Sequence, residues 1–257
     1  MKQSADPPQN SPLLGIITGM EHSGTTAMAQ LVISNCVTVN AGFEIGVLLC
    51  PNSPHEFCHQ GRFYDWLCEP TKNGHWGLTI QQRDEVCQAQ DWNDFYARLM
   101  QASPVFTAQH THLIDKAPAY VYTLEQVLQH MSSVPIVVVH KPIAALYSSY
   151  RKRNVSLQDF SSRYRQYRRS LQRVIGNDRV MIVHHDELCE RPAEVLRDVC
   201  DFLGVDTDHS ISTDLDWNLA PIRKDYSAAA ELQQAKNSLS LLERIVLGFI
   251  DLGFRPK

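Results

Sequence analysis

The sequence lacks any run approaching 18 apolar residues, so no segment is long enough to cross a membrane as a helix. It also lacks an excess of basic charge, because 24 lysines and arginines stand against 28 acidic residues. The formal net charge of −4 argues against nucleic acid as a partner. The first dozen residues are polar and proline-rich and contain no apolar stretch of the kind that signal peptides need. We expect residues 1–12 to be a disordered lead-in.

Recognisable cysteine and histidine patterns are missing too. The seven cysteines are an odd number and include no CxxC pair, so neither a disulfide framework nor a zinc site is indicated. A reducing compartment, and hence a cytoplasmic protein, is the favoured interpretation. The eleven histidines do not combine with carboxylates into a metal-ligand pattern, and we expect no metal cofactor.

The pattern that is present is an alternation of apolar runs and amphipathic segments. Runs at 13–18, 37–40, 112–116, 135–140 and 179–184 predict buried strands. Helical spacing predicts helices over 25–35, 92–101, 123–130, 143–153, 156–175, 192–203 and 240–252. Strands that alternate with helices predict an α/β fold, a parallel β-sheet flanked by helices on both faces. At 257 residues, we expect a single domain over 13–257.

One region departs from this alternation. Residues 50–104 hold three tryptophans and many polar residues, prolines and glycines, with only one segment that predicts a helix. We interpret this region as an insertion or lid, where the specificity of a site is expected to lie.

A glycine-containing turn between the first strand and the first helix is the first candidate site. A helix N-terminus offers unpaired N–H groups and a partial positive charge to phosphate or sulfate oxygens. Gly24 allows close approach of the backbone, and Ser23, Thr25 and Thr26 add hydroxyl donors. Gly19 and Gly24 keep the spacing of a P-loop, but Thr25 replaces its lysine, which disfavours ordinary ATP or GTP hydrolysis. The alternative is a turn that binds nothing.

The run SGTT at 23–26 resembles the 5′-phosphosulfate loop of the sulfotransferases, in which a basic residue precedes SGTT. His22 takes the basic position here. The resemblance spans roughly 13–254 and is nearest to the protein-tyrosine and bacterial types. It implies a P-loop nucleoside triphosphate hydrolase-like fold and sulfuryl transfer from 3′-phosphoadenosine-5′-phosphosulfate (PAPS) to a hydroxyl or amine of a small molecule, glycan or peptide. The loop residues implied to bind the donor are Glu21, His22, Ser23, Gly24, Thr25 and Thr26.

The resemblance also assigns catalytic roles. Glu44, in the segment AGFEIG, matches the glutamate that acts as general base toward the acceptor hydroxyl. Lys116, in the segment DKAPAY, matches a Lys-x-Pro-x-Tyr element and would stabilise charge on the transferring oxygens together with His22. Alternatively, Glu44 caps a turn or pairs with a surface cation.

A second strand–turn–helix segment resembles the family's 3′-phosphate element. It places His140 where the family has arginine, and Ser148 eight residues later. Arginine would bind a phosphate with two hydrogen bonds, whereas histidine offers one donor at a time. Lys141 and Arg151 are candidates to compensate. Near the C-terminus, Arg223 and Lys224 are candidates to cover the same phosphate.

Two other functions stay open. A P-loop phosphotransferase would need a loop lysine and an acidic magnesium ligand, and Thr25 argues against it. A non-catalytic member of the same fold that binds a nucleotide or a partner protein is kept open by His22 and His140, since both basic positions of the family are histidine. Neither the acceptor nor the oligomeric state is indicated.

Overall fold

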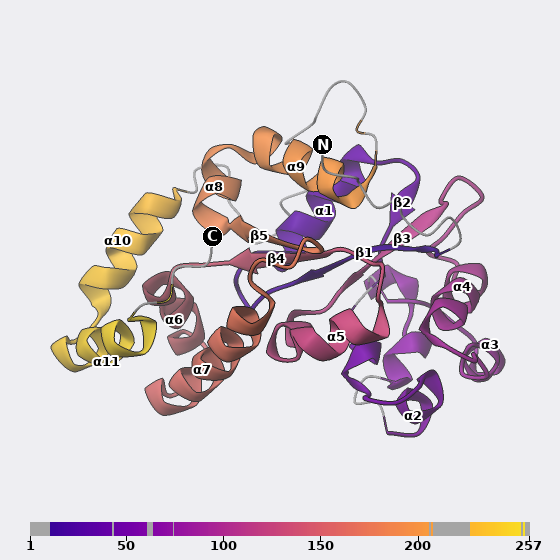
Figure 1. The fold of residues 1–257 in the computed structure, drawn as a ribbon, viewed down its shortest axis with the longest axis horizontal. Helices are drawn as coiled ribbons and strands as arrows, with labels where there is room; N and C mark the ends of the chain where they lie inside the picture. Colours follow the sequence, from indigo (N-terminus) through magenta and orange to yellow (C-terminus); the bar gives the residue numbers. More distant parts are fainter. Residues whose placement is uncertain are drawn as a thin grey trace.

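The computed structural model describes residues 11–42, 44–60, 64–73, 75–205, 207, 227–252 and 254. In this part of the chain five parallel strands form one sheet in the order β2-β3-β1-β4-β5 (Figure 1). The predicted parallel sheet is confirmed. The strands are β1 (Leu13–Thr18), β2 (Val39–Asn40), β3 (His112–Lys116), β4 (Ile136–His140) and β5 (Val180–His184).

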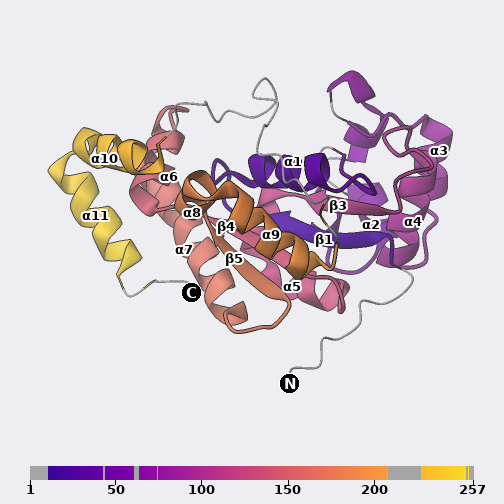
Figure 2. The ribbon, with the colours of Figure 1, turned by 90° about the horizontal axis from the view of Figure 1, so that it is seen from above.

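Helices cover both faces of the sheet, as predicted (Figures 1 and 2). One face carries α1 (Thr25–Asn35) and α9 (Pro192–Leu203), which bury Met28 and Leu196 against Ile17 and Val137. The other face carries α4 (Trp92–Ala102), α5 (Leu124–His130), α6 (Ile143–Arg151) and α7 (Leu157–Val174). Successive side chains of a strand point to opposite faces of the sheet, so each strand contributes to two separate cores. In β4, for example, Val138 lies in one core and Val137 in the other.

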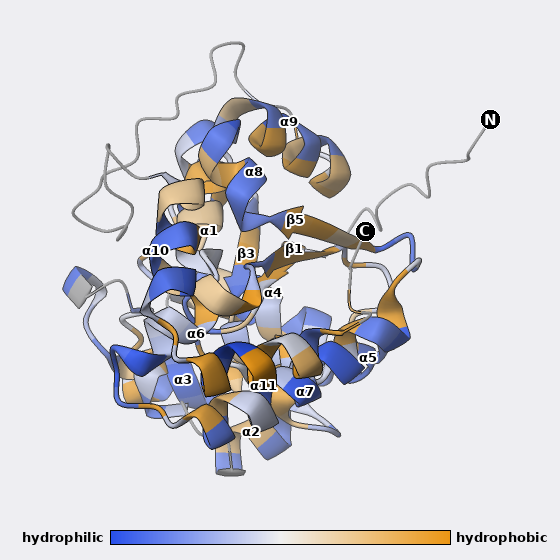
Figure 3. Ribbon diagram, turned by 90° about the vertical axis from the view of Figure 1, so that its left-hand side faces the viewer, coloured by the Kyte–Doolittle hydropathy of each residue, from blue (hydrophilic) through white to orange (hydrophobic). Residues whose placement is uncertain are grey.

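Two C-terminal helices, α10 (Ala228–Ser238) and α11 (Leu241–Asp251), lie at the end of the sheet near α6 (Figure 1). The outward side of α11 is apolar (Figure 3). Each of five large apolar side chains there is more than half exposed: Leu241, Leu242, Ile245, Phe249 and Leu252. None of the described helices is long and apolar enough to cross a membrane.

Four helices were not predicted from the sequence. Two lie in the 50–104 region, α2 (Pro54–Gln60) and α3 (Ile80–Val86), so the expectation of one helix there is wrong. The others are α8 (His185–Glu190) and α10. Helices of six or seven residues are too short for periodicity to reveal. They are fixed instead by single buried side chains, such as Phe57 in α2, and by caps, such as the Thr79 capping box of α3.

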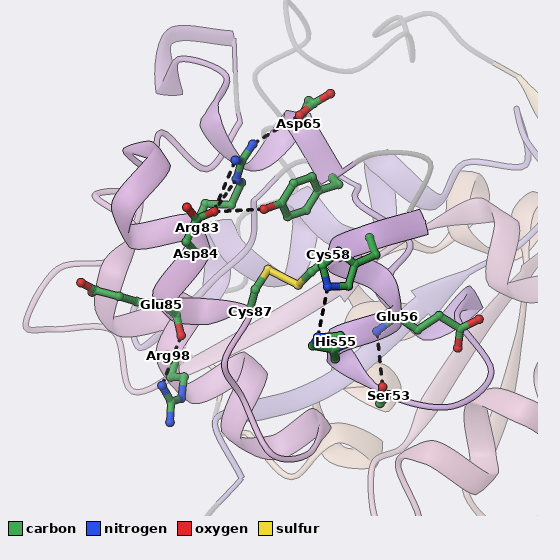
Figure 4. Close-up of a disulfide and its surroundings, with 12 residues drawn as sticks. Ser53, His55, Glu56, Cys58, Asp65, Arg83, Asp84, Glu85, Cys87 and Arg98 are labelled. Carbon is green, nitrogen blue, oxygen red and sulfur yellow. Dashed lines mark hydrogen bonds and ion pairs between the residues drawn. A yellow bond between two sulfur atoms is a disulfide. The ribbon is translucent and has the colours of Figure 1, made fainter.

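The 50–104 region also contains a disulfide between Cys58 and Cys87, which joins α2 to the end of α3 (Figure 4). This corrects the sequence prediction, which found no disulfide signal. The odd cysteine count concealed the pair, because the other five cysteines form no disulfide among the described residues: Cys36, Cys50, Cys68, Cys189 and Cys200. Connectivity depends on which cysteines the fold brings together, and spacing alone does not give it.

We expect loss of this disulfide to lower the free energy of unfolding by about 3–4 kcal/mol, because a bond across 29 residues restricts the unfolded chain. Urea unfolding of the oxidised protein, the reduced protein and the Cys58→Ser/Cys87→Ser variant measures the loss. Cys50→Ser is the matched control, since Cys50 is a free cysteine. A stability that is insensitive to reductant, together with titration of seven free thiols, would contradict the bond.

Candidate functional site

The β1–α1 loop leaves the carboxyl edge of the sheet and folds tightly against β4 and α8. A Cβ atom on Gly19 (φ 154°) would lie 2.4 Å from the carbonyl oxygen of Val139. A Cβ atom on Gly24 (φ 104°), which caps α1, would lie 2.8 Å from a ring carbon of His185. Because both positions lack room for a side chain, glycine is required to hold the loop in this shape.

The Ser23 side chain lies inside the loop. The Ser23 backbone N–H donates to the carbonyl oxygen of Met20 at 3.0 Å and closes the turn. Its hydroxyl is 1% exposed and has no hydrogen-bond partner in the part of the chain that the structure describes. Burial of such a group without a partner costs free energy that a ligand atom recovers. With the N-terminus of α1 beside it, the site suits an anionic oxygen.

His22 and Glu21 differ in charge. Burial lowers the pKa of His22 below its ordinary value, and Arg153 and Lys141 act in the same direction, opposed by Glu21. His22 also adopts a positive φ of 71° and packs edge-on against the Tyr150 ring. Its side chain is therefore neutral near pH 7 and does not provide the family's loop cation.

Glu21 is ionised and held by its neighbours. Burial raises its pKa, but hydrogen bonds from Tyr150 and Tyr122 outweigh this, so the pKa lies below its ordinary value. The Tyr122 hydroxyl donates to the Glu21 carboxylate at 2.8 Å, Tyr150 donates as well, and Arg163 lies 3.6 Å away. The Glu21 carboxylate thus holds the loop against Tyr122, Tyr150 and Arg163. Only the backbone of Glu21 then remains available to bind a ligand.

Glu44 and Lys116, the two other predicted catalytic residues, meet directly. Lys116 ends β3 and donates from Nζ to the Glu44 carboxylate at 2.9 Å. In the sheet, Lys116 lies opposite Ile17 of β1, so the pair is at the same edge as the loop. Both side chains are mostly buried, at 29% exposed for Glu44 and 11% for Lys116. A carboxylate held beside an ammonium at a strand end can accept a proton while the ammonium faces developing negative charge.

His140 lies in an aromatic cluster. Its Nδ1 is 2.6 Å from the Tyr167 hydroxyl, and its ring contacts Tyr167, His184 and Phe254. Burial, helped by His184, lowers its pKa to about 4. His140 is therefore uncharged at neutral pH, unlike the arginine that the family places here.

Ser148 is half-buried on α6, and no side-chain hydrogen bond involves it within the described chain. Arg151 is turned to the C-terminal helices, where it donates to the Ser238 carbonyl oxygen at 3.0 Å and lies 3.6 Å from Glu243. The remaining candidates, Arg223 and Lys224, lie outside the described residues.

A charged pair beside the loop was not predicted as a unit. Lys141, which follows β4, is 5% exposed, and its Nζ lies 2.8 Å from the carboxylate of Glu231 on α10. His185 is also buried here, and burial, helped by the Lys141 charge, lowers its pKa to about 4. Glu231 is remote in sequence and belongs to an unpredicted helix, so no spacing pattern points to it.

The expectation that no histidines combine with carboxylates in a metal-ligand spacing is wrong for one motif: His55-Glu-Phe-Cys-His59 in α2 has the spacing of zinc proteases. The two Nε2 atoms lie 3.1 Å apart, but Glu56 accepts hydrogen bonds from Asn52, and the cysteine within the motif is disulfide-bonded. No group of three or more His, Cys, Asp or Glu side chains that could hold a metal occurs among the described residues.

The two buried histidines make stability depend on pH. His140 and His185 have pKa values of about 4 in the folded chain, against about 6.5 when unfolded. Between these values the unfolded chain binds more protons, so the free energy of unfolding falls as pH drops from about 6.5 toward 4.

From pH 7 to pH 5 we expect a loss of about 2 kcal/mol for each of these two histidines. Urea unfolding at both pH values measures the loss, and His140→Gln is expected to reduce it by about 2 kcal/mol. His55→Gln, at an exposed histidine, is the control. An equal loss in wild type and His140→Gln would contradict the assignment.

Comparisons with known proteins agree with this architecture. A family model described as "Sulfotransferase family" matches residues 16–209. The sulfotransferase domain of the Synechococcus PCC 7002 olefin synthase superimposes with a TM-score of 0.59 at 19% identity, covering 99% of this chain and 100% of that one. The sulfotransferase domain from the curacin biosynthetic pathway gives a TM-score of 0.50 at 16% identity, covering 88% of this chain and 98% of that one.

No curated protein sequence matches the chain. The family model nevertheless spans well over half of it, and the structural likeness shows the P-loop-like α/β fold of these enzymes. The chain belongs to the sulfotransferase family.

Proposed function

We propose that this protein transfers a sulfuryl group from PAPS to an acceptor hydroxyl or amine. The observation that carries the proposal is the buried Ser23 hydroxyl, which has no partner in the described chain and lies at the N-terminus of α1. A phosphate or sulfate oxygen of the donor would complete its hydrogen bonding. The pair Glu44–Lys116 lies at the same edge of the sheet and supports transfer chemistry there.

In this mechanism the acceptor oxygen forms a bond to sulfur while the bond from sulfur to the bridging phosphate oxygen breaks. Glu44 accepts the acceptor's proton, and Lys116 stabilises negative charge on the transferring oxygens. The product 3′-phosphoadenosine-5′-phosphate (PAP) leaves with the bridging oxygen. The loop amides and hydroxyls hold donor and acceptor in line, which supplies much of the acceleration. Ser148 would bind the 3′-phosphate.

We expect PAP to bind the wild type with micromolar affinity and the Ser23→Ala/Ser148→Ala variant at least about 10-fold more weakly. Each removed hydroxyl donates to a charged phosphate, and such a bond contributes about 1.5–3 kcal/mol. Calorimetry measures both affinities. Ser149→Ala is the matched control, because the Ser149 hydroxyl donates to the Ala145 carbonyl oxygen of its own helix. Failure of the wild type to bind PAP would overturn the donor assignment.

We expect Glu44→Gln to lower turnover by about 10²–10⁴-fold, because glutamine cannot accept the acceptor's proton. PAP affinity should stay within about 3-fold, since the carboxylate serves the acceptor. Release of PAP from PAPS in the presence of pooled phenols, alcohols, amines and glycans measures turnover. A variant as active as wild type would remove Glu44 as the base.

A second candidate, a nucleotide-binding member without catalysis, is favoured by one observation: His22 and His140 are both held neutral by burial. It differs from the first in one measurable outcome, PAP binding without sulfation of any pooled acceptor.

A further inference from the structure

The proposed donor is strongly anionic, yet the two family positions that should carry positive charge hold neutral histidines. A cation for the loop must come from elsewhere. Lys141 is a buried cation beside the loop, because it lies two residues beyond Val139, whose carbonyl oxygen and side chain flank Gly19 and Gly24. Its charge acts on both His22 and His185, which bracket the loop.

We propose that the Lys141 ammonium is the cation for the 5′-phosphosulfate end of the donor, and that Glu231 of α10 holds this ammonium until the donor displaces the carboxylate. The inference rests on the proposed function. Lys141 Nζ lies 2.8 Å from Glu231 and its side chain is 6% exposed, so the ammonium is already desolvated. A desolvated cation attracts an anion far more strongly than one in water.

The placement of α10 makes the exchange possible. It packs against α6, which begins just after Lys141, and against α8, which carries His185 (Figures 1 and 2). Of the α10 side chains, only Ala228 and Ala235 are fully buried and Leu232 is partly buried, so Glu231 lies on a helix that exposes much of its surface to solvent. Because the attraction within a buried ion pair does little more than offset its desolvation cost, Glu231 can return to water when an anion of higher charge takes its place.

The test is calorimetric binding of PAP to the full chain and to single variants. Glu231→Gln should tighten binding by about 3–10-fold, because no carboxylate competes for Lys141. Lys141→Met should weaken it by about 10-fold or more, and Lys141→Arg should keep binding within about 3-fold of wild type. In the Lys141→Met background, Glu231→Gln should leave PAP affinity unchanged, because no ammonium remains for which the carboxylate and PAP could compete.

The matched control is Glu125→Gln, which breaks a 2.9 Å ion pair with Arg173 on helices away from the loop. It should leave PAP binding unchanged. A second ligand, adenosine 3′-phosphate, lacks the 5′ anion, so Lys141→Met should not change its affinity.

Three outcomes would overturn the inference. The first is a PAP affinity in the Glu231→Gln variant that equals or falls below that of the wild type. Another is Lys141→Met that binds PAP as wild type does, and a third is equal weakening of PAP and adenosine 3′-phosphate. Circular dichroism melting of each variant identifies loss of folding. If Lys141→Met does not fold, the PAP affinity of Lys141→Arg, provided that it folds as wild type does, decides whether the cation at this position binds the donor. If the wild type binds no PAP, the proposed function itself is wrong. If the wild type binds PAP but the variants do not behave as expected, only the role of Lys141 and Glu231 is wrong.

Discussion

The contact between the β1–α1 loop and the end of β4 is the constraint on which the site depends. Because the Val139 carbonyl oxygen occupies the space of a side chain at Gly19, the loop cannot spread away from the sheet. Confined there, it buries the Ser23 hydroxyl without a partner in the described chain and directs the N-terminus of α1 to the same point. The anion binding that we propose for the loop follows from close packing and backbone geometry, without a cationic side chain in the loop.

That packing also explains why the family's basic positions can be histidine. A ring buried at a strand end, as His140 is, lacks the hydration that its charged form needs, and its Nδ1 shares a hydrogen bond with the Tyr167 hydroxyl. His22 experiences the same penalty and two nearby cations as well. In the proposed donor site the positive charge thus comes from lysines and the helix N-terminus, while the histidines contribute shape and hydrogen bonds.

The sequence predicted every strand of the described sheet and the helices with a clear apolar face, because buried strands are apolar runs and amphipathic helices have a 3.6-residue periodicity. It missed α10, which is eleven residues long but buries only two alanines. The structure brings the predicted residues Glu44 and Lys116 together, since the carboxyl ends of adjacent parallel strands meet at one edge of the sheet. What could not be predicted depends on tertiary contacts. The Cys58–Cys87 bond and the Lys141–Glu231 pair join residues whose proximity only packing decides. Likewise, no spacing rule shows that His140 is neutral, because its pKa is set by burial and His184.

Two ion pairs, Lys116–Glu44 and Lys141–Glu231, lie at the ends of strands on either side of β1. In each, a lysine that can face an anion is paired with a glutamate, so the ligand-free site keeps its charges compensated. Compensation has a functional consequence, since an uncompensated buried ammonium would lose its proton or destabilise the fold. The two glutamates then differ in role by position. In our proposals Glu44, which follows β2, is the proton acceptor at the reacting centre, whereas Glu231, on a helix at the end of the sheet, is exchanged for a ligand.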